Sequence, residues 1–330
     1  MNKILYISHD GIFDHIGQSQ ILPYLKINSS FYKIFLITYE KKIYNDRIAS
    51  VKHQLYTSYG IEWLPQAYHK SLLGKFYDFF KLILFSAFII LKKRISFSHC
   101  RGYIPTLGIY FINKILNNNY LFDIRDFWAD EGLEIKKHKF VYKIIKKIEG
   151  KMIKNAKHVV CLTNSAKKYI LEKYSDIKSE NISIIPCGTD FNLFNPNSLN
   201  KKKIKQIKKI LKFKNKKILL YYGSIGLNYL LDKKIFFFKS INKKNDWVFL
   251  FLINNDLEFL KKLLISKGMN SKDFKILNVD RNELPEYLSM VDLSIFFYRE
   301  GMRSIGCSPT KLADLFAMNI PIITDSNLGD

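Results

Sequence analysis

A charged stretch near the end of the chain has the residue types of a phosphate-binding loop. Residues 300–314 read EGMRSIGCSPTKLAD, and the apolar runs on both sides predict strands. Ser308 is a good helix N-cap, Pro309 fits the first helical position, and residues 310–317 are compatible with a helix. A helix that begins after a strand presents free backbone N–H groups and the positive end of its dipole. Phosphate binds well at such a place.

The side chains of this stretch suit a nucleotide ligand. Arg303 and Lys311 carry full positive charges, and Ser308 and Thr310 stand at the start of the predicted helix. Asp314 falls on that helix, where its carboxylate is expected to accept hydrogen bonds from sugar hydroxyls. An ordinary capped helix in an α/β core has the same pattern, so the stretch alone leaves both interpretations open.

A second candidate loop follows a predicted strand at residues 218–222. Small residues at Gly223, Ser224 and Gly226 let the backbone approach a phosphate closely. A tight turn uses the same glycines, so this loop only supports the first one. The loop after the strand predicted at residues 3–8 lacks a GxGxxG fingerprint, which disfavours a hydride-transfer enzyme.

A third cluster follows the strand predicted near residue 120, where the sequence reads YLFDIRDFWADE. Arg125, Asp126 and Trp128 come just past the strand end, and charged and aromatic residues packed there are typical of a substrate site. The alternative is an ion pair among Arg125, Asp126 and Arg101, with Trp128 in the core. We favour the substrate site.

Composition limits the fold and the compartment. A chain of 330 residues with 48% hydrophobic content has room for two domains with their own cores. The four cysteines are scattered, which predicts free thiols in a reducing, cytoplasmic compartment. The cysteines and the seven histidines show no metal-ligand spacing, so we predict no metal site. The first residues, MNKILYISHDG, resemble a strand more than a signal peptide because their apolar run is short.

The formal net charge of +24 favours anionic partners. Nucleotide phosphates, nucleic acid and an anionic membrane surface all fit such a field. A lysine-rich bias across the whole proteome would account for about half of the charge without any partner. No nucleic-acid-binding motif is present in the sequence, so we do not expect a nucleic-acid partner.

Two segments raise the question of membrane contact. Residues 82–91, LILFSAFIIL, are flanked by basic residues but span only about half a bilayer as a helix, so a buried or interfacial helix is expected and not a transmembrane one. Residues 136–157 form a basic amphipathic pattern, which suits either an anionic lipid surface or a solvated helix face. The pattern slightly favours the solvated face.

Strands and helices alternate along the chain, which predicts α/β domains with parallel sheets. We expect a first domain at residues 1–194, a lysine-rich linker at residues 195–217, and a second domain at residues 218–330. The chain stops soon after a predicted strand, so the second domain is expected to be incomplete.

Five stretches, in this order, resemble the large retaining glycosyltransferase family 4. They are residues 10–24 (DGIFDHIGQSQILPY), 101–105 (RGYIP), 123–131 (DIRDFWADE), 185–194 (IPCGTDFNLF) and 308–314 (SPTKLAD). The resemblance implies the GT-B architecture, in which two Rossmann-like domains face each other across a cleft. It also implies transfer of a sugar from a nucleotide-diphosphate sugar to a carbohydrate or lipid-linked acceptor with retention of configuration, in the cytoplasm or at the inner membrane face, without a cofactor.

The resemblance assigns roles to residues in both domains. Donor binding falls to Gly223, Ser224, Gly226, Arg303, Ser308, Thr310, Lys311 and Asp314. Acceptor binding falls to Gly17, Gln18, Ser19, Arg101 and Trp128. Arg125 and Asp126 stand where many members have a histidine, so we take them as the candidate catalytic residues.

The chain departs from the family pattern in the donor half. Residues 225–231 lack the Arg and Lys that often follow the glycine-rich turn, and Lys233 and Lys234 come too late for a clear match. The family's paired glutamates correspond to Gly306 and Asp314, so the first is missing. We therefore expect Arg303 and Lys311 to supply the positive charge. A non-catalytic nucleotide-sugar binder and a nucleotide-sugar epimerase of the same fold remain alternatives.

Overall fold

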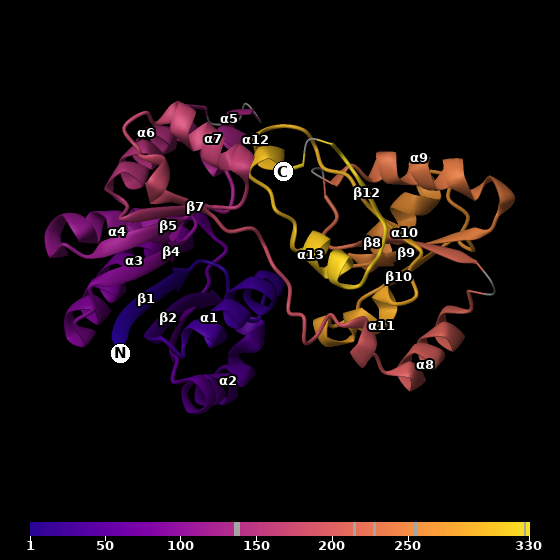
Figure 1. The fold of residues 1–330 in the computed structure, drawn as a ribbon, viewed down its shortest axis with the longest axis horizontal. Helices are drawn as coiled ribbons and strands as arrows, with labels where there is room; N and C mark the ends of the chain where they lie inside the picture. The colour runs from indigo at the N-terminus through magenta and orange to yellow at the C-terminus, as the bar shows by residue number, and fades with distance from the viewer. Residues whose placement is uncertain (135–138, 214–215, 227–228, 254–255, 327) are drawn as a thin grey trace. The chain divides into compact units, whose positions relative to one another are not determined.

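The computed structural model describes residues 1–134, 139–213, 216–226, 229–253, 256–326 and 328–330, which fold into two α/β units (Figure 1). Unit 1 comprises Met1–Pro186, Gly301–Ser308 and Gly329–Asp330, and unit 2 comprises Cys187–Glu300 and Pro309–Leu328. The expected fold class, two Rossmann-like domains, is confirmed. The chain enters unit 2 at Cys187, before the boundary expected after residue 194, and residues 301–308 fold with unit 1.

Unit 1 is built on a parallel sheet whose strand order is β3-β2-β1-β4-β5-β6-β7 in the described residues. The chain adds strands outward in one direction from β1 to β3 and in the other direction from β4 to β7. Ligands of α/β folds bind at such a reversal of strand order, here between β1 and β4. The strands are β1 (Asn2–Ser8), β2 (Tyr32–Glu40), β3 (Glu62–Ala67), β4 (Phe97–Arg101), β5 (Asn119–Asp123), β6 (His158–Cys161) and β7 (Ile182–Ile184).

Helices cover both faces of this sheet. One core packs Leu22, Leu25 and Leu55 of α1 and α2 on one face, and the other packs residues of α3, α4, α6 and α7, including Leu82 and Ile109, on the opposite face. Right-handed crossovers produce this division. The helices are η1 (Gly17–Ile21), α1 (Leu22–Asn28), η2 (Lys42–Tyr44), α2 (Asn45–Tyr59), α3 (Leu72–Lys93), α4 (Tyr103–Leu116), α5 (Trp128–Glu134), α6 (Lys139–Asn155), α7 (Asn164–Lys173), η3 (Ser179–Asn181) and α12 (Met302–Ile305).

Unit 2 has a smaller parallel sheet of order β10-β9-β8-β11-β12, again in the described residues, and its direction reverses between β8 and β11. The strands are β8 (Lys217–Tyr222), β9 (Trp247–Leu252), β10 (Phe274–Leu277), β11 (Leu293–Phe296) and β12 (Ile322–Thr324). The helices are η4 (Pro196–Ser198), α8 (Lys201–Leu211), α9 (Leu231–Ile241), η6 (Asn242–Lys244), α10 (Leu257–Ser266), η7 (Arg281–Glu283), α11 (Leu284–Leu288) and α13 (Thr310–Ala317).

The lysine-rich segment expected to be a linker is part of unit 2. Its residues form α8, which packs against α11 (Figure 1). Ile207 and Leu211 are buried on the inner side of α8, and Lys203 Nζ lies 2.9 Å from Glu283 Oε1. Residues 214–215, at the end of the expected linker, lie outside the described residues.

The basic segment expected at residues 136–157 becomes α6, and residues 136–138 lie outside the described residues. Met152 and Ile153 of α6 are buried in the core of unit 1, while its exposed side carries mostly lysines. This burial of one side fits both the solvated-face and the anionic-lipid interpretations. Within the described residues, α3 and every other helix are too short or too polar to cross a membrane.

Candidate functional site

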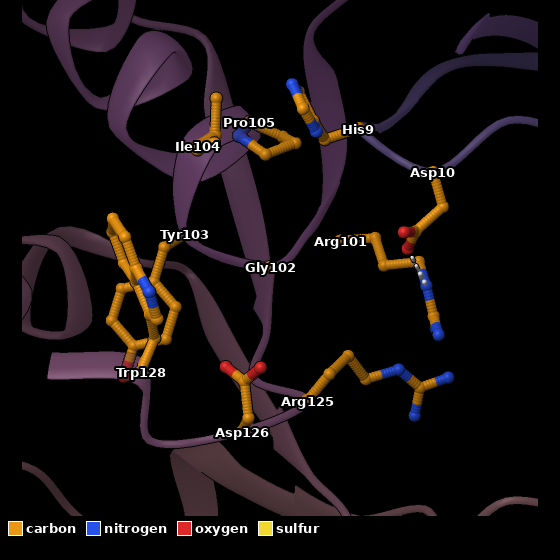
Figure 2. A pocket seen from close by; sticks show the side chains of 10 residues that line it. All are labelled: His9, Asp10, Arg101, Gly102, Tyr103, Ile104, Pro105, Arg125, Asp126 and Trp128. Atoms are coloured by element: carbon orange, nitrogen blue, oxygen red, sulfur yellow. Dashed lines mark ion pairs between the residues drawn. The ribbon is translucent and has the colours of Figure 1, made fainter. Parts of the chain in front are cut away.

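A pocket of about 180 Å³ opens in unit 1 where the sheet direction reverses. The loops after β1, β4 and β5 contribute its walls, so the three strand ends place the side chains around one space (Figure 2). Its lining residues are His9, Asp10, Arg101, Gly102, Tyr103, Ile104, Pro105, Arg125, Asp126 and Trp128. Ligands of doubly wound sheets bind at this position.

A buried carboxylate holds the loop that carries His9 and Asp10. Glu40 is 2% exposed, and its Oε1 accepts the Ile12 backbone N–H at 2.8 Å and the Thr38 hydroxyl at 2.7 Å. Burial raises the pKa of Glu40, and these two hydrogen bonds oppose that shift. The loop is thus fixed to the end of β2.

Two arginines surround a buried aspartate on one side of the pocket. Asp123 Oδ2 lies 3.4 Å from Arg125 Nε, 3.7 Å from Arg101 Nη1 and 3.4 Å from His99 Nε2. Burial alone would raise the pKa of Asp123, but Arg125, His99 and Arg101 outweigh it and lower that pKa. The cluster therefore keeps its carboxylate ionised and holds the two guanidinium groups at the pocket wall.

Both the substrate-site and the ion-pair interpretations of this region are therefore partly met. The arginines do form ion pairs, but with Asp123 at the end of β5, which the sequence pattern placed inside a strand. Trp128 is 41% exposed, so the part of the ion-pair interpretation that placed Trp128 in the core is wrong. Asp126 lines the pocket between the arginines and the aromatic side (Figure 2).

Aromatic rings form the opposite wall of the pocket. Tyr103 and Trp128 meet edge to face, with ring centroids 6.0 Å apart (Figure 2). The Tyr103 hydroxyl donates to Glu149 Oε2 at 2.8 Å, and Lys146 Nζ donates to Glu149 Oε1 at 2.6 Å. This network ties the ring of Tyr103 to α6.

A carboxyl group of raised pKa lies on α5, the helix that begins at the lining residue Trp128. Burial raises the pKa of Glu131 to about 7, and the nearby positive charge of Arg303 opposes the shift. Arg303 Nη1 lies 3.6 Å from Glu131 Oε2. Arg303 was expected among the donor-binding residues, but it belongs to unit 1 together with α5.

Three residues expected to bind the acceptor pack the first loop and lie outside the pocket lining described above. Gln18 Nε2 donates to the Ile12 carbonyl at 2.6 Å, and the Ser19 hydroxyl donates to the His15 carbonyl at 2.7 Å. A β-carbon on Gly17 would lie 2.2 Å from the Gly11 carbonyl oxygen, so only glycine fits.

The next residue, Gln20, was not identified from the sequence as part of the site. Its Oε1 accepts from Arg101 Nη2 at 2.6 Å and from Arg125 Nη2 at 3.4 Å. The contacts span 81 and 105 positions of sequence, so no local pattern reveals them.

Unit 2 brings two lysines together where its own sheet direction reverses. Gly223 has a φ of +118°, a backbone conformation that favours glycine, and a β-carbon there would lie 2.8 Å from Lys311 Nζ, so that side chain would have to move. Lys311 Nζ also lies 4.8 Å from the ring centroid of Tyr221 and 5.7 Å from that of Tyr298. Gly223 and Lys311, separated by 88 positions in the chain, thus form one site.

The second lysine is Lys234, which was not assigned to the donor site from the sequence because it comes too late after the glycine-rich turn to match the family pattern. Its side chain is 1% exposed, and its Nζ lies 3.4 Å from the ring centroid of Tyr221. Burial, reinforced by the charge of Lys311, lowers the pKa of Lys234 to about 6. The available signal was periodicity, since Lys234 shares the buried side of α9 with Ile235 and Phe238.

Asp314 does not stand where a sugar would reach it. Its side chain is 0% exposed, and Arg281 Nη1 and Nη2 donate to its two oxygens at 3.1 and 3.2 Å. The hydroxyls of Thr189 and Tyr222 also donate to it, at 2.5 and 3.0 Å. Its expected role as a sugar ligand is therefore replaced by an internal ion pair.

The start of α13 also differs from the expectation. Pro309, with φ −66° and ψ 125°, occupies the N-cap position, so Ser308 is not the cap and the helix begins at Thr310. Residues 302–305, expected as loop, form the short helix α12. Ser308 falls in unit 1 and Thr310, 9% exposed, in unit 2.

The remaining residues of the second glycine loop have structural contacts. The Ser224 carbonyl accepts from the Tyr221 hydroxyl, and the Gly226 carbonyl accepts from the Tyr229 N–H at 3.0 Å. Residues 227–228 lie outside the described residues. A β-carbon on Gly306 would lie 3.1 Å from Phe127 Cδ2, so a glutamate there would have to displace that ring.

Comparison with known proteins identifies relatives of the same fold. No protein-family model matches the chain. The chain is 24% identical over 209 residues to TuaH of Bacillus subtilis (strain 168), whose name is putative teichuronic acid biosynthesis glycosyltransferase. The matched region is 62% of this chain and 49% of that protein. The chain thus spans about half the length of this curated relative.

Two solved structures extend the likeness over the whole chain. A glycosyltransferase from Rickettsia africae ESF-5 superposes with a TM-score of 0.68 at 16% identity, covering 100% of this chain and 80% of that one. Anabaena Alr3699/HepE, solved with UDP and glucose, gives a TM-score of 0.68 at 10% identity, covering 98% and 80%. These identities show the fold alone, and that fold is the α/β arrangement of GT-B glycosyltransferases.

Proposed function

We propose that this chain is a retaining glycosyltransferase that moves a hexose from a nucleotide-diphosphate sugar to a carbohydrate or lipid-linked acceptor. The observation that carries the proposal is the meeting of Gly223, Lys311 and Lys234 at the strand ends of unit 2. Close backbone approach, the Lys311 ammonium group and a second amine that can take up a proton suit a diphosphate. The sequence likeness to TuaH and the shared fold add support.

In this proposal unit 2 holds the donor. Lys311 stabilises the negative charge that develops on the diphosphate as the sugar leaves, and the N-terminus of α13 adds its dipole. Lys234 is neutral near pH 7 because its pKa is about 6. A bound diphosphate favours the ammonium form, so Lys234 takes up a proton as the donor binds.

Unit 1 holds the acceptor in its pocket. At about 180 Å³ the pocket is smaller than the roughly 300–1,000 Å³ that encloses a drug-sized ligand, so it takes one end of a larger acceptor. The Tyr103–Trp128 wall suits the apolar face of a sugar ring. Asp126 and Arg125 are the groups within this pocket that we assign to hydrogen-bonding the acceptor hydroxyl and to stabilising charge on the transferred sugar.

Binding of UDP, GDP and their sugars, measured by calorimetry on the full chain, tests the donor site. We expect one nucleotide series to bind, and Lys311→Ala to weaken binding at least tenfold, on the order of one lost charged contact. Lys233→Ala is the matched control, because that side chain lies in the first turn of α9 and is 59% exposed. Equal loss in both variants, or no binding by any nucleotide, would contradict the donor site.

Turnover separates the glycosyltransferase from its alternatives. With the bound donor and a panel of glycan and lipid-linked acceptors, we expect acceptor-dependent release of the nucleotide, and a product whose anomeric configuration by NMR equals that of the donor. Nucleotide release with an epimerised free sugar would identify an epimerase. Binding without any turnover would identify a non-catalytic binder.

A further inference from the structure

One side of α3 carries a long row of exposed apolar side chains. Each is more than half exposed, although the helix packs firmly on the sheet through its other side, where Leu82, Ile89 and Ile90 are buried. The row consists of Leu72, Leu73, Phe76, Tyr77, Phe80, Leu84, Phe88 and Leu91. We call it the α3 stripe.

The α3 stripe is continuous. A helix turns about 100° per residue, so these positions occupy a single side about 160° wide along its 22 residues, a length of about 33 Å. The neighbouring helix α4 packs alongside α3 (Figure 1) and adds the exposed side chains Phe111 and Ile115. A β-carbon on Gly108 would lie 2.4 Å from Leu82 Cδ2, which shows how closely the two helices approach.

Basic residues border the stripe and exposed acidic residues are missing from it. Lys81 Nζ lies 6.0 Å from the ring centroid of Tyr77, and Lys92 Nζ lies 5.2 Å from that of Phe88. Their aliphatic stems thus run beside the rings while the ammonium groups stay at the edge. Asp78, the only acidic residue in α3, is 2% exposed and pairs with His69 at 2.6 Å.

Large exposed apolar patches on a folded protein mark an interaction surface. We propose that the α3 stripe, with Phe111 and Ile115, lies in the interface of a bilayer that contains anionic lipid. An amphipathic helix with aromatic residues on its apolar side and lysines at its edge inserts its apolar side among the headgroups and acyl chains. The net charge of +24 strengthens attraction to the anionic surface.

Charge decides between a bilayer and a second copy of the chain as the occupant. A symmetric pair of α3 stripes would bring Lys81, Lys92 and Arg94 of both copies to one interface. Helix α3 has no exposed acidic side chain that could offset these charges. An anionic headgroup layer instead supplies the opposite charge. The stripe lies along the surface and does not span a bilayer, since its other side is part of the core of unit 1.

Flotation of the full chain with vesicles tests this surface. We expect binding to vesicles of phosphatidylcholine with phosphatidylglycerol, and weaker binding to phosphatidylcholine alone. The variant Phe76→Ser, Phe80→Ser, Leu84→Ser should bind the anionic vesicles on the order of tenfold more weakly or worse. The control Ile27→Ser, Phe31→Ser, Ile43→Ser removes equally exposed side chains elsewhere in unit 1 and should bind like the parent.

A second measurement separates insertion from adsorption through charge alone. Tryptophan at the stripe, in Phe80→Trp, should be quenched by brominated acyl chains, whereas Phe31→Trp should not be. Unchanged flotation of the triple variant, or no quenching in Phe80→Trp, would overturn the proposal. So would a parent dimer that the triple variant converts to a monomer while neither binds vesicles, because the stripe would then be a self-association interface.

Discussion

The Lys234 ammonium nitrogen lies 3.4 Å from the ring centroid of Tyr221, inside unit 2. Within the described residues this well-buried ammonium group lies against the aromatic face of Tyr221, and the charge of Lys311 nearby repels it. The position therefore costs stability whenever Lys234 is protonated.

This arrangement predicts an unusual dependence of stability on pH. The folded pKa of Lys234 is about 6, below the ordinary lysine value of 10.5, so between these values the unfolded chain binds one more proton than the folded chain. The contribution of Lys234 to the free energy of unfolding therefore rises with pH across that window, by up to about 1.4 kcal/mol per unit, and is least favourable below pH 6. Urea unfolding of the parent and of Lys234→Met should show their difference shrinking steadily from pH 6 to pH 9. A constant difference would mean that Lys234 titrates normally.

The contact of Lys311 with Gly223 predicts coupling between the two positions. Alanine at Gly223 would bring a β-carbon within 2.8 Å of Lys311 Nζ and strain a backbone with φ +118°. We expect Gly223→Ala to weaken nucleotide binding by displacing Lys311, and to have little further effect in a chain that already carries Lys311→Ala. Calorimetry on the two single variants and the double variant measures this. Additive losses would show that the positions act separately.

Asp314 is predicted to support the fold of unit 2. Removing its carboxylate leaves Arg281, whose side chain is 13% exposed, without its ion pair, and breaking a buried pair typically costs about 3–5 kcal/mol. Asp314→Ala should lower the urea midpoint accordingly. Asp232→Ala breaks a surface pair with Lys267 and should cost about 1 kcal/mol or less. If Asp314→Ala were as stable as Asp232→Ala and lost only nucleotide affinity, Asp314 would contact the ligand after all.

Glu131 gives unit 1 the opposite pH response. Its folded pKa of about 7 exceeds the ordinary glutamate value of 4.5, so between these values the folded chain binds the extra proton. The stability contributed by protonated Glu131 is complete below pH 4.5 and is lost as pH rises through about 7. Glu131→Gln keeps the shape of the protonated carboxyl, so it should be more stable than the parent at pH 8 and nearly equal at pH 4.5, as judged by thermal unfolding. Equal stability at both pH values would place the ionised carboxylate in contact with solvent.

The alternation of strands and helices was readable from the sequence because most strands are continuous apolar runs. The run at residues 218–222 is β8 almost to the residue, whereas β3 was missed, since Pro65 and Gln66 interrupt its pattern. Its place at the edge of the sheet tolerates both residues. Helix α2 was missed for a related reason, because Leu55 is its one buried residue and leaves little periodicity to detect.

The candidate sites were partly readable. Strand ends pointed to Arg101, Arg125 and Trp128, because parallel strands bring their carboxyl ends to one edge of the sheet. Partners were not readable, since they depend on distant pairings such as Gln20 with Arg101 and Arg281 with Asp314. The sequence predicted that the Asp314 carboxylate binds a ligand, whereas in the structure it forms an ion pair with Arg281.

The return of residues 301–308 to unit 1 limits how the protein can be divided for study. The Met302 N–H donates to Glu134 Oε1 at 2.9 Å, and the Thr163 hydroxyl donates to the Ile305 carbonyl at 2.7 Å. Helix α5 and the start of α7 therefore rely on residues that lie between the two chain segments of unit 2. A fragment ending at Pro186 would lack these contacts, and one proteolytic cut cannot release either unit intact. Separate expression of unit 1 would require residues 301–308 to be rejoined by a designed connection, much as in a circular permutation.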